Sequence, residues 1–268
     1  MSRPTSGKSS RVVTPGIDDF AIGVYQGAGF LKRFFVEVVR PPFHLGEVVR
    51  QCYEIGYRSL PLITLTGFVT GIVFTKQSRP SLAAFGATSW LPSLITIALV
   101  RSLAPLITAL ICAGKVGSNI GAELGSMKVT EQIEAMEVSA INPFKFLVVT
   151  RTLATTLMVP VLMLYCCFVG LVGSYFNVHG NEAASLASFL KDGFSTITFL
   201  DVWSSVGKTF VYGFTIGIIG CHKGYNASSG TRGVGMAANA SVVLSMFAIF
   251  IEEVLIVQVI TWFRGFDF

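Results

Sequence analysis

Charged residues are scarce in this sequence. Only 13% of the 268 residues are charged and 52% are hydrophobic, and the mean hydropathy is +0.66. Ordinary soluble domains carry about 25% charged residues. The scarcity of charge therefore excludes an ordinary soluble domain and indicates a membrane protein.

Residue combinations that bind metals or form disulfides are also lacking. The five cysteines form no CxxC pair, and the three histidines, His44, His179 and His222, are scattered without metal-ligand spacing. We therefore expect no metal site, and we interpret the cysteines as packing residues.

Catalytic and nucleotide-binding motifs are missing as well. An intramembrane protease or acyltransferase would need a nucleophile and a base at membrane depth, and the apolar stretches offer such a pair only at an edge, at Cys221-His222. Gly207-Lys208-Thr209 resembles the end of a P-loop, but the position that needs the loop's first glycine is Val202. We expect no catalytic residue, no bound cofactor and no ATP site in this chain.

Long stretches without any charge are what the sequence does contain. They cover residues 59–75, 80–100, 152–181 and 233–251. A membrane-spanning helix needs about 20 mostly apolar residues. The pattern predicts an all-α polytopic membrane protein whose transmembrane domain covers residues 59–268, with five spans at about 59–74, 91–113, 147–176, 202–221 and 236–263.

The N-terminal part is too polar to span a membrane. Residues 1–16 are basic and polar, so we expect them to be disordered, and no apolar stretch behind them suggests a cleaved signal peptide. Residues 17–58 predict amphipathic helices that lie on the membrane surface, interrupted at Arg40-Pro41-Pro42. A small soluble cap is the alternative for this part.

The basic residues predict the orientation. With the N-terminus inside, fourteen Lys and Arg residues lie on the cytoplasmic side and four on the outside. Cytoplasmic segments of membrane proteins carry such an excess. The polar segment 115–146, between the second and third predicted spans, is then cytoplasmic.

This polar segment predicts a short amphipathic helix over residues 130–138. Thr130 is the expected N-cap, and Pro143 is expected to stop the helix. One face carries carboxylates and the other carries apolar side chains. The residues expected to transmit force to a soluble partner are Glu123, Thr130, Glu131, Ile133, Glu134, Met136 and Glu137. An ordinary solvated loop helix is the alternative.

Four ionisable residues fall within the predicted spans: Arg101, Lys208, Glu252 and Glu253. A charged side chain at membrane depth costs a few kcal/mol, so it usually pairs or faces a cavity. Lys208 is expected to pair with Glu252 or Glu253. Arg101 either pairs as well or binds a lipid phosphate, for which its planar fork is suited. Residues expected to contact lipid are Arg101, Ser102, Phe74 and Lys76.

One run, AELGSMKVTEQIEAMEVSAINPFKFLVVTR, closely resembles the signature of the MlaE/YrbE-type permeases, and a looser similarity extends from about Arg50 to the C-terminus. These permeases are membrane subunits of ABC transporters that move lipids together with MCE-domain proteins. One departure concerns Arg101: many relatives read LRELGP there, and this chain has Ser102 in place of the acid.

The resemblance implies an assembly in the bacterial inner membrane. It implies a homodimer, cytoplasmic ATPase subunits that hold ATP and magnesium, an MCE-domain partner in the periplasm and a lipid substrate, with no nucleic acid. It also implies an interfacial elbow helix in the N-terminal part and a coupling helix within residues 123–138. The lipid would be a phospholipid or another hydrophobic compound such as a sterol or fatty acid. A membrane anchor that does not transport is the further alternative.

Overall fold

The computed structural model describes residues 15–41, 43–182 and 185–264, and it divides the chain into two compact units, residues 1–40 and 41–268. Residues 1–14, most of the segment expected to be disordered, lie outside the described residues. In the first unit, α1 (Pro15–Val39) is a single helix whose exposed side chains include Lys32, Arg33, Phe35 and Val39. This mixture of charged and apolar exposed residues fits a helix at a membrane surface.

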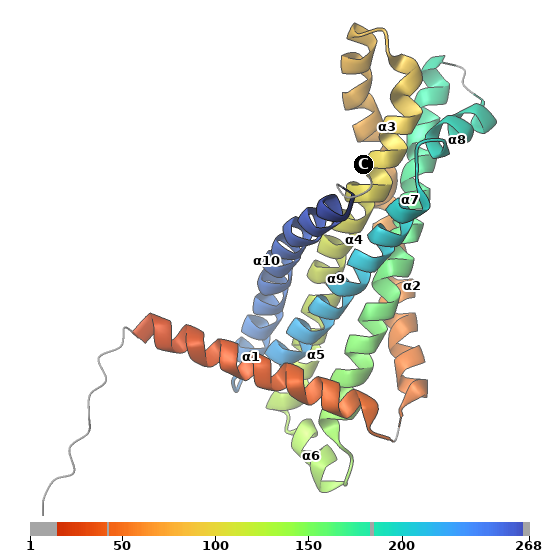
Figure 1. Ribbon diagram of the computed structural model, residues 1–268. Helices are drawn as coiled ribbons and strands as arrows, with labels where there is room; N and C mark the ends of the chain where they lie inside the picture. Colours follow the sequence, from red (N-terminus) through yellow and green to blue (C-terminus); the bar gives the residue numbers. More distant parts are fainter. Residues whose placement is uncertain (1–14, 42, 183–184, 265–268) are drawn as a thin grey trace, which may run out of the picture. The chain divides into compact units, whose positions relative to one another are not determined.

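In the described part of the second unit every regular element is helical (Figure 1). Four helices are long and apolar enough to cross a membrane: Leu45–Ala84, Thr88–Val129, Phe144–Gly180 and Thr231–Trp262. The second and third combine shorter segments. The elements, in chain order, are α2 (Leu45–Ala84), η1 (Thr88–Trp90), α3 (Leu91–Ala98), η2 (Leu99–Leu103), α4 (Ala104–Cys112), η3 (Ala113–Gly117), α5 (Ser118–Val129), α6 (Gln132–Val138), η4 (Phe144–Val149), α7 (Thr150–Glu182), α8 (Leu186–Phe194), α9 (Phe199–Tyr225) and α10 (Thr231–Arg264).

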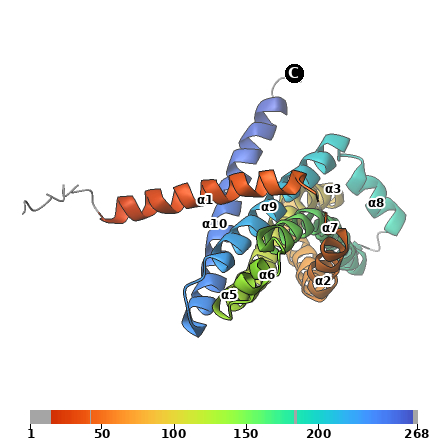
Figure 2. The same ribbon diagram turned by 90° about the horizontal axis from the view of Figure 1, so that it is seen from below.

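The expected fourth span, residues 202–221, lies within α9, which is not among the four apolar helices. Its 27 residues give a length of about 40 Å, enough to cross a bilayer. However, α9 contains Asp201 and Lys208, which lower its hydropathy, and both side chains are buried. Because α9 packs against α5, α7 and α10, it presents these polar groups to protein (Figure 2). A fifth crossing by α9 stays a prediction.

The start of the transmembrane domain differs from the expected boundary at residue 58. Residues 45–58 are not a separate surface helix, because α2 runs without a break from Leu45 to Ala84 and includes Pro61 and Pro80. Residues 76–84, expected to form part of an outer connection, also belong to this helix. Gln51, Ile55 and Ser59 are buried at a spacing of four, so the early part of α2 packs on the same face as the rest.

The closest helix contact joins α2 to α7 at two glycines. A Cβ atom at Gly71 would lie 2.0 Å from the carbonyl oxygen of Gly170, and one at Gly67 would lie 3.0 Å from that of Cys166. The Gly67–Gly71 pair has the GxxxG spacing that lets helix backbones approach in membranes. The GxxxG face of α2 therefore packs against α7.

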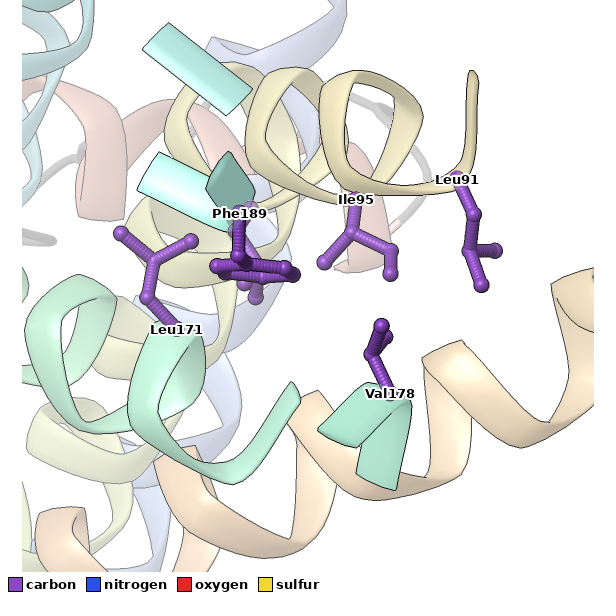
Figure 3. Packing of buried hydrophobic residues seen from close by; sticks show 6 residues of the cluster. Leu91, Ile95, Leu171, Val178 and Phe189 are labelled. Carbon is purple, nitrogen blue, oxygen red and sulfur yellow. The ribbon is translucent and has the colours of Figure 1, made fainter. Parts of the chain in front are cut away.

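At the opposite end of the bundle from α6, an apolar cluster fixes α8 against α3 and α7 (Figures 1 and 3). The Phe189 side chain of α8 is almost fully buried between Ile95 of α3 and Leu171 of α7. A hydrogen bond from Ser93 Oγ to the carbonyl oxygen of Asp192, at 2.7 Å, adds a polar contact between α3 and α8. This cluster closes the end of the bundle that is expected to face outward.

Three π-helical turns lie in two of the long helices, Thr88–Val129 and Phe144–Gly180. Such turns contain an additional residue per turn and are frequent at functional sites. The turn η2 contains Arg101. The other two, η3 and η4, lie before α5 and before α7. Together η3 and η4 bracket the hairpin formed by α5 and α6, which extends to the lower end of the bundle in Figure 1.

Candidate functional site

The helix in the hairpin is shorter than the sequence predicted. It begins at Gln132 and ends at Val138. Thr130 is not its N-cap, because Thr130 ends α5 and its hydroxyl donates back to the carbonyl oxygen of Ser126, at 2.9 Å. Threonine can cap a helix or bond to the preceding turn, and here the second geometry wins. Pro143 also does not stop α6, which ends before it.

Two left-handed residues bracket α6 and cause its short length. Glu131 has a φ of 59° and Ala140 a φ of 60°. At the C-terminal end, the Ala140 amide donates to the carbonyl oxygen of Glu137 and the Ile141 amide to that of Met136, both at 3.0 Å. This is the Schellman arrangement, which normally has glycine in the left-handed position. Alanine there costs about 1 kcal/mol.

Replacing Ala140 with glycine is therefore expected to stabilise the end of α6. Glycine adopts a positive φ without a steric penalty, so the local gain is about 1 kcal/mol. Amides of α6 should then exchange with solvent about fivefold more slowly, as measured by hydrogen–deuterium exchange of the purified protein. Ala135→Gly, in the middle of the same helix, is the matched control and should increase exchange. Faster exchange in Ala140→Gly would contradict the assignment of the left-handed cap.

The side chains of α6 divide into anchored and exposed groups. Ile133 is only 2% exposed and fixes the helix to the hairpin, and Met136 is half-buried. Glu134 pairs with Lys128 of α5, and this hydrogen bond lowers the pKa of the Glu134 carboxyl. Glu131 and Glu137 are exposed, as is Val138, at 89%. The exposed side chains of this segment therefore include one apolar group and two carboxylates.

Glu123 has an internal partner. Its Oε1 lies 2.6 Å from Nη2 of Arg151, a residue of α7 whose side chain is buried. Nη1 of Arg151 also donates to the carbonyl oxygen of Leu147, at 3.3 Å. The pair joins α5, which leads into the hairpin, to the first turn of α7, which follows the hairpin, and so stabilises its base. Glu123 thus lies apart from the exposed surface of α6 and acts within the chain.

A second group of polar residues forms a buried polar network between η2, α9 and α10. Nζ of Lys208 lies 2.9 Å from Oε1 of Glu253 and 2.6 Å from the carbonyl oxygen of Arg101. The Tyr212 hydroxyl donates to the other oxygen of Glu253. Lys208 is therefore paired with Glu253. Glu252 instead accepts from the Thr215 hydroxyl, at 2.5 Å.

Arg101 belongs to the same network through Asp201. Nε and Nη2 of Arg101 lie 2.9 Å from Oδ1 and Oδ2 of Asp201, which is fully buried. Asp201 also accepts from the backbone amide of Thr198, at 3.0 Å, and so caps the start of α9. The guanidinium fork thus faces a carboxylate of this chain, the geometry in which it would also bind a phosphate.

The four residues expected to contact lipid do not come together. Phe74 packs against the apolar cluster of α3, α7 and α8, and Lys76 is exposed near the same end. Ser102 is exposed next to the paired Arg101. Sequence reasoning missed Asp201 and Tyr212 as members of the network. Asp201 carried a signal, since its spacing of three residues from Thr198 is that of a capping pair.

Among the described residues no group of three His, Cys, Asp or Glu side chains could hold a metal ion. Apolar helices of membrane length, a network of charges between them and a braced polar hairpin at one end define a multi-pass membrane protein of the permease class. The sequence profile of the family described as Permease MlaE matches residues 48–259. The chain therefore belongs to the MlaE permease family.

Individual relatives agree with this assignment. A probable ABC transporter permease protein of Rickettsia typhi is 34% identical over 244 residues, which cover 90% of this chain and 92% of the relative. A protein of the same description from Synechocystis is 33% identical, over 82% of this chain and 83% of the relative. The chloroplastic protein trigalactosyldiacylglycerol 1 of Arabidopsis thaliana is 29% identical, over 81% of this chain and 62% of the relative. This chain is the membrane subunit of a transporter, and ATP hydrolysis belongs to a separate subunit.

Proposed function

We propose that this chain is the permease of a lipid-moving ABC transporter in the bacterial inner membrane, with its N-terminus and α6 in the cytoplasm. In this proposal, α6 is the coupling helix that docks on an ATPase subunit. The chain works as a homodimer and exchanges phospholipid, or a similar lipid, with an MCE-domain protein in the periplasm.

The observation that carries the proposal is the surface of α6. Val138, the last residue of α6, is 89% exposed, and the carboxylates of Glu131 and Glu137 on the same short segment are also exposed. Protein contact surfaces commonly combine an apolar centre with a polar rim, and the exposed side chains of α6 have this composition. The hairpin behind it is braced by the pairs Lys128–Glu134 and Glu123–Arg151, so a force applied to α6 reaches α7 directly.

Two further observations support a lipid and a second copy of the chain. The helix α10 is the least buried of the four apolar helices and exposes Phe247, Val254 and Leu255. Such a face requires lipid or another apolar helix beside it. The name of the plant relative is also that of a galactolipid. Import of a sterol or fatty acid, and a role as a membrane anchor without transport, are the competing functions.

The docking role of α6 is tested with the double variant Glu137→Lys/Val138→Asp. It reverses one exposed charge and removes the exposed apolar side chain, and neither side chain makes a hydrogen bond or a salt bridge among the described residues. Co-purification of the ATPase subunit should fall at least tenfold, because contact centres tolerate such changes poorly. The permease itself should still be inserted and should elute normally in size-exclusion chromatography.

Glu134→Gln is the control, since Glu134 is paired within the hairpin and its loss should leave the docking surface intact. Normal ATPase binding and normal ATP-driven lipid transfer in the double variant would remove α6 as the coupling helix. Lipid transfer by the purified permease without any ATPase would remove the transporter proposal as a whole.

A further inference from the structure

A cavity of about 470 Å³ opens at the end of the bundle that carries the hairpin. Its walls are the early part of α2, the turn η3, the helix α5 and the start of α10. Figure 1 shows the start of α2, the end of α5 and the start of α10 at this same end, away from α3 and α8. The cavity lies within the size range of small-ligand sites.

The lining of this cavity carries several charged and polar side chains among its apolar ones. It includes the cations Arg58 and Lys115, the carboxylates of Glu54 and Glu123, the amides of Gln51 and Asn119, and the hydroxyls of Ser59 and Ser126. Three sides of the cavity thus carry groups that can bind a charged ligand. Apolar residues such as Ile55 and Val116 form part of the remaining wall.

Several of these groups have no partner within the chain. Ser59 is only 1% exposed, and its hydroxyl lacks a hydrogen bond to any described residue. The side chains of Arg58, Glu54 and Asn119 likewise make no hydrogen bond or ion pair inside the described part of the molecule. Lys115 donates to the carbonyl oxygen of Arg58, which holds its ammonium group beside the guanidinium-bearing residue. Of these groups only Ser59 is buried, while Arg58 and Asn119 are exposed and Glu54 is half-buried. A buried polar group without a partner, as at Ser59, is uncommon in folded proteins and points to a bound molecule.

The two candidate phosphate sites, at Arg101 and at Arg58 with Lys115, differ in whether their cations are already paired with a carboxylate. Arg101 faces the fully buried carboxylate of Asp201, so an anion would have to displace that pair. Among the described residues Arg58 and Lys115 form no ion pair, and the carboxylate of Glu123 on the same lining is paired with Arg151 instead. Guanidinium and ammonium groups side by side bind a phosphodiester through charge-assisted hydrogen bonds. Glu54 on the same lining suits an ammonium group.

We propose that this cavity binds the head group of a phospholipid from the cytoplasmic leaflet, with Arg58, Lys115 and Ser59 on the phosphate and Glu54 on an amine. The inference deepens the proposed lipid transport, on which it rests, by naming a phosphoethanolamine-type head group and its entry site. The acyl chains would leave through the open side of the cavity towards the membrane.

The test is native mass spectrometry of the full-length permease in detergent, titrated with dihexanoyl phosphatidylethanolamine. In Arg58→Gln/Lys115→Gln the dissociation constant should rise at least tenfold, and Ser59→Ala should raise it about threefold. Glu54→Gln should weaken the ethanolamine lipid about fivefold and leave dihexanoyl phosphatidylglycerol unchanged, since only the former carries an amine. If the double variant fails to fold, the single variant Arg58→Gln, which changes an exposed side chain, is used for the same titration.

Arg50→Gln is the matched control, because Arg50 is an exposed cation of the same helix that does not line the cavity. Equal affinity for the ethanolamine lipid in the wild type and the Arg58 variants would overturn the inference. Equally tight binding of inorganic phosphate, with the same response to the variants, would overturn it in favour of a phosphate site. Both results leave the α6 docking experiment untouched, so failure of this site and failure of the proposed function are distinguishable.

Discussion

Replacing Lys208 with methionine is expected to lower the free energy of unfolding by about 3–5 kcal/mol, because a buried charge loses its partner. Lys208 bonds to both oxygens of Glu253, at 2.9 and 3.2 Å, and to the carbonyl oxygen of Arg101. Without Lys208, the carboxylate of Glu253, whose side chain is 15% exposed, keeps the Tyr212 hydroxyl as its one hydrogen-bond partner among the described residues. The melting temperature in detergent should fall by about 10 °C.

The double variant Lys208→Met/Glu253→Leu separates pairing from packing. Removing both charges leaves no unpaired carboxylate, so the double variant should be more stable than Lys208→Met alone. Lys191→Met, at an exposed lysine of α8, is the control and should be close to neutral. Stability losses that simply add in the double variant would show that the two side chains do not depend on each other.

Replacing Gly71 with alanine is the second change with a large expected effect. The added Cβ would lie 2.0 Å from the carbonyl oxygen of Gly170 and 2.9 Å from Ser174 Oγ, so the backbones of α2 and α7 must separate. Overpacking at such a contact costs about 3 kcal/mol. We expect a lower melting temperature and a smaller folded fraction in size-exclusion chromatography.

Gly46→Ala is the matched control within the same helix, since nothing lies within 4 Å of a Cβ at Gly46. Alanine is the better helix former by about 1 kcal/mol, so this variant should be neutral or slightly more stable. If Gly71→Ala and Gly46→Ala behaved alike, helix propensity rather than the α2–α7 contact would dominate at both positions.

The sequence was sufficient for those features that depend on strong energetic penalties. Charge is costly in a membrane, and this predicted the apolar helices and drew attention to Lys208 and Glu253, which the fold brings together. The GxxxG spacing of Gly67 and Gly71 is likewise visible in the sequence and is typical of close helix packing, which the fold makes with α7. In each case the alternative structure would contain an unpaired charge or a steric clash, and this energetic cost makes the observed arrangement predictable.

Other features depended on choices of similar energy. The Thr130 hydroxyl could cap α6 or bond to a carbonyl oxygen of α5, and the sequence does not decide between them. Glu131 and Ala140 have a positive φ, which residue type alone does not predict because glycine is the usual residue there. Asp201 appeared to belong to an outer loop, whereas the fold brings it to Arg101 and removes that arginine from the expected lipid site. The cavity at Arg58 and Lys115 combines residues 57 positions apart in the chain, which no local pattern could join.

The π-helical turn η3 allows the helix α5 to rotate about its own axis by one residue. An α-helix advances roughly 100° and about 1.5 Å for each residue, so reabsorbing the additional residue of η3 would swing the following segment by that amount. A second π-helical turn, η4, lies after the hairpin, where the chain re-enters the bundle. Both ends of the hairpin could therefore rotate while α5 stays helical. The ion pair between Glu123 of α5 and Arg151 of α7, just after η4, would have to break or shift with such a rotation of α5.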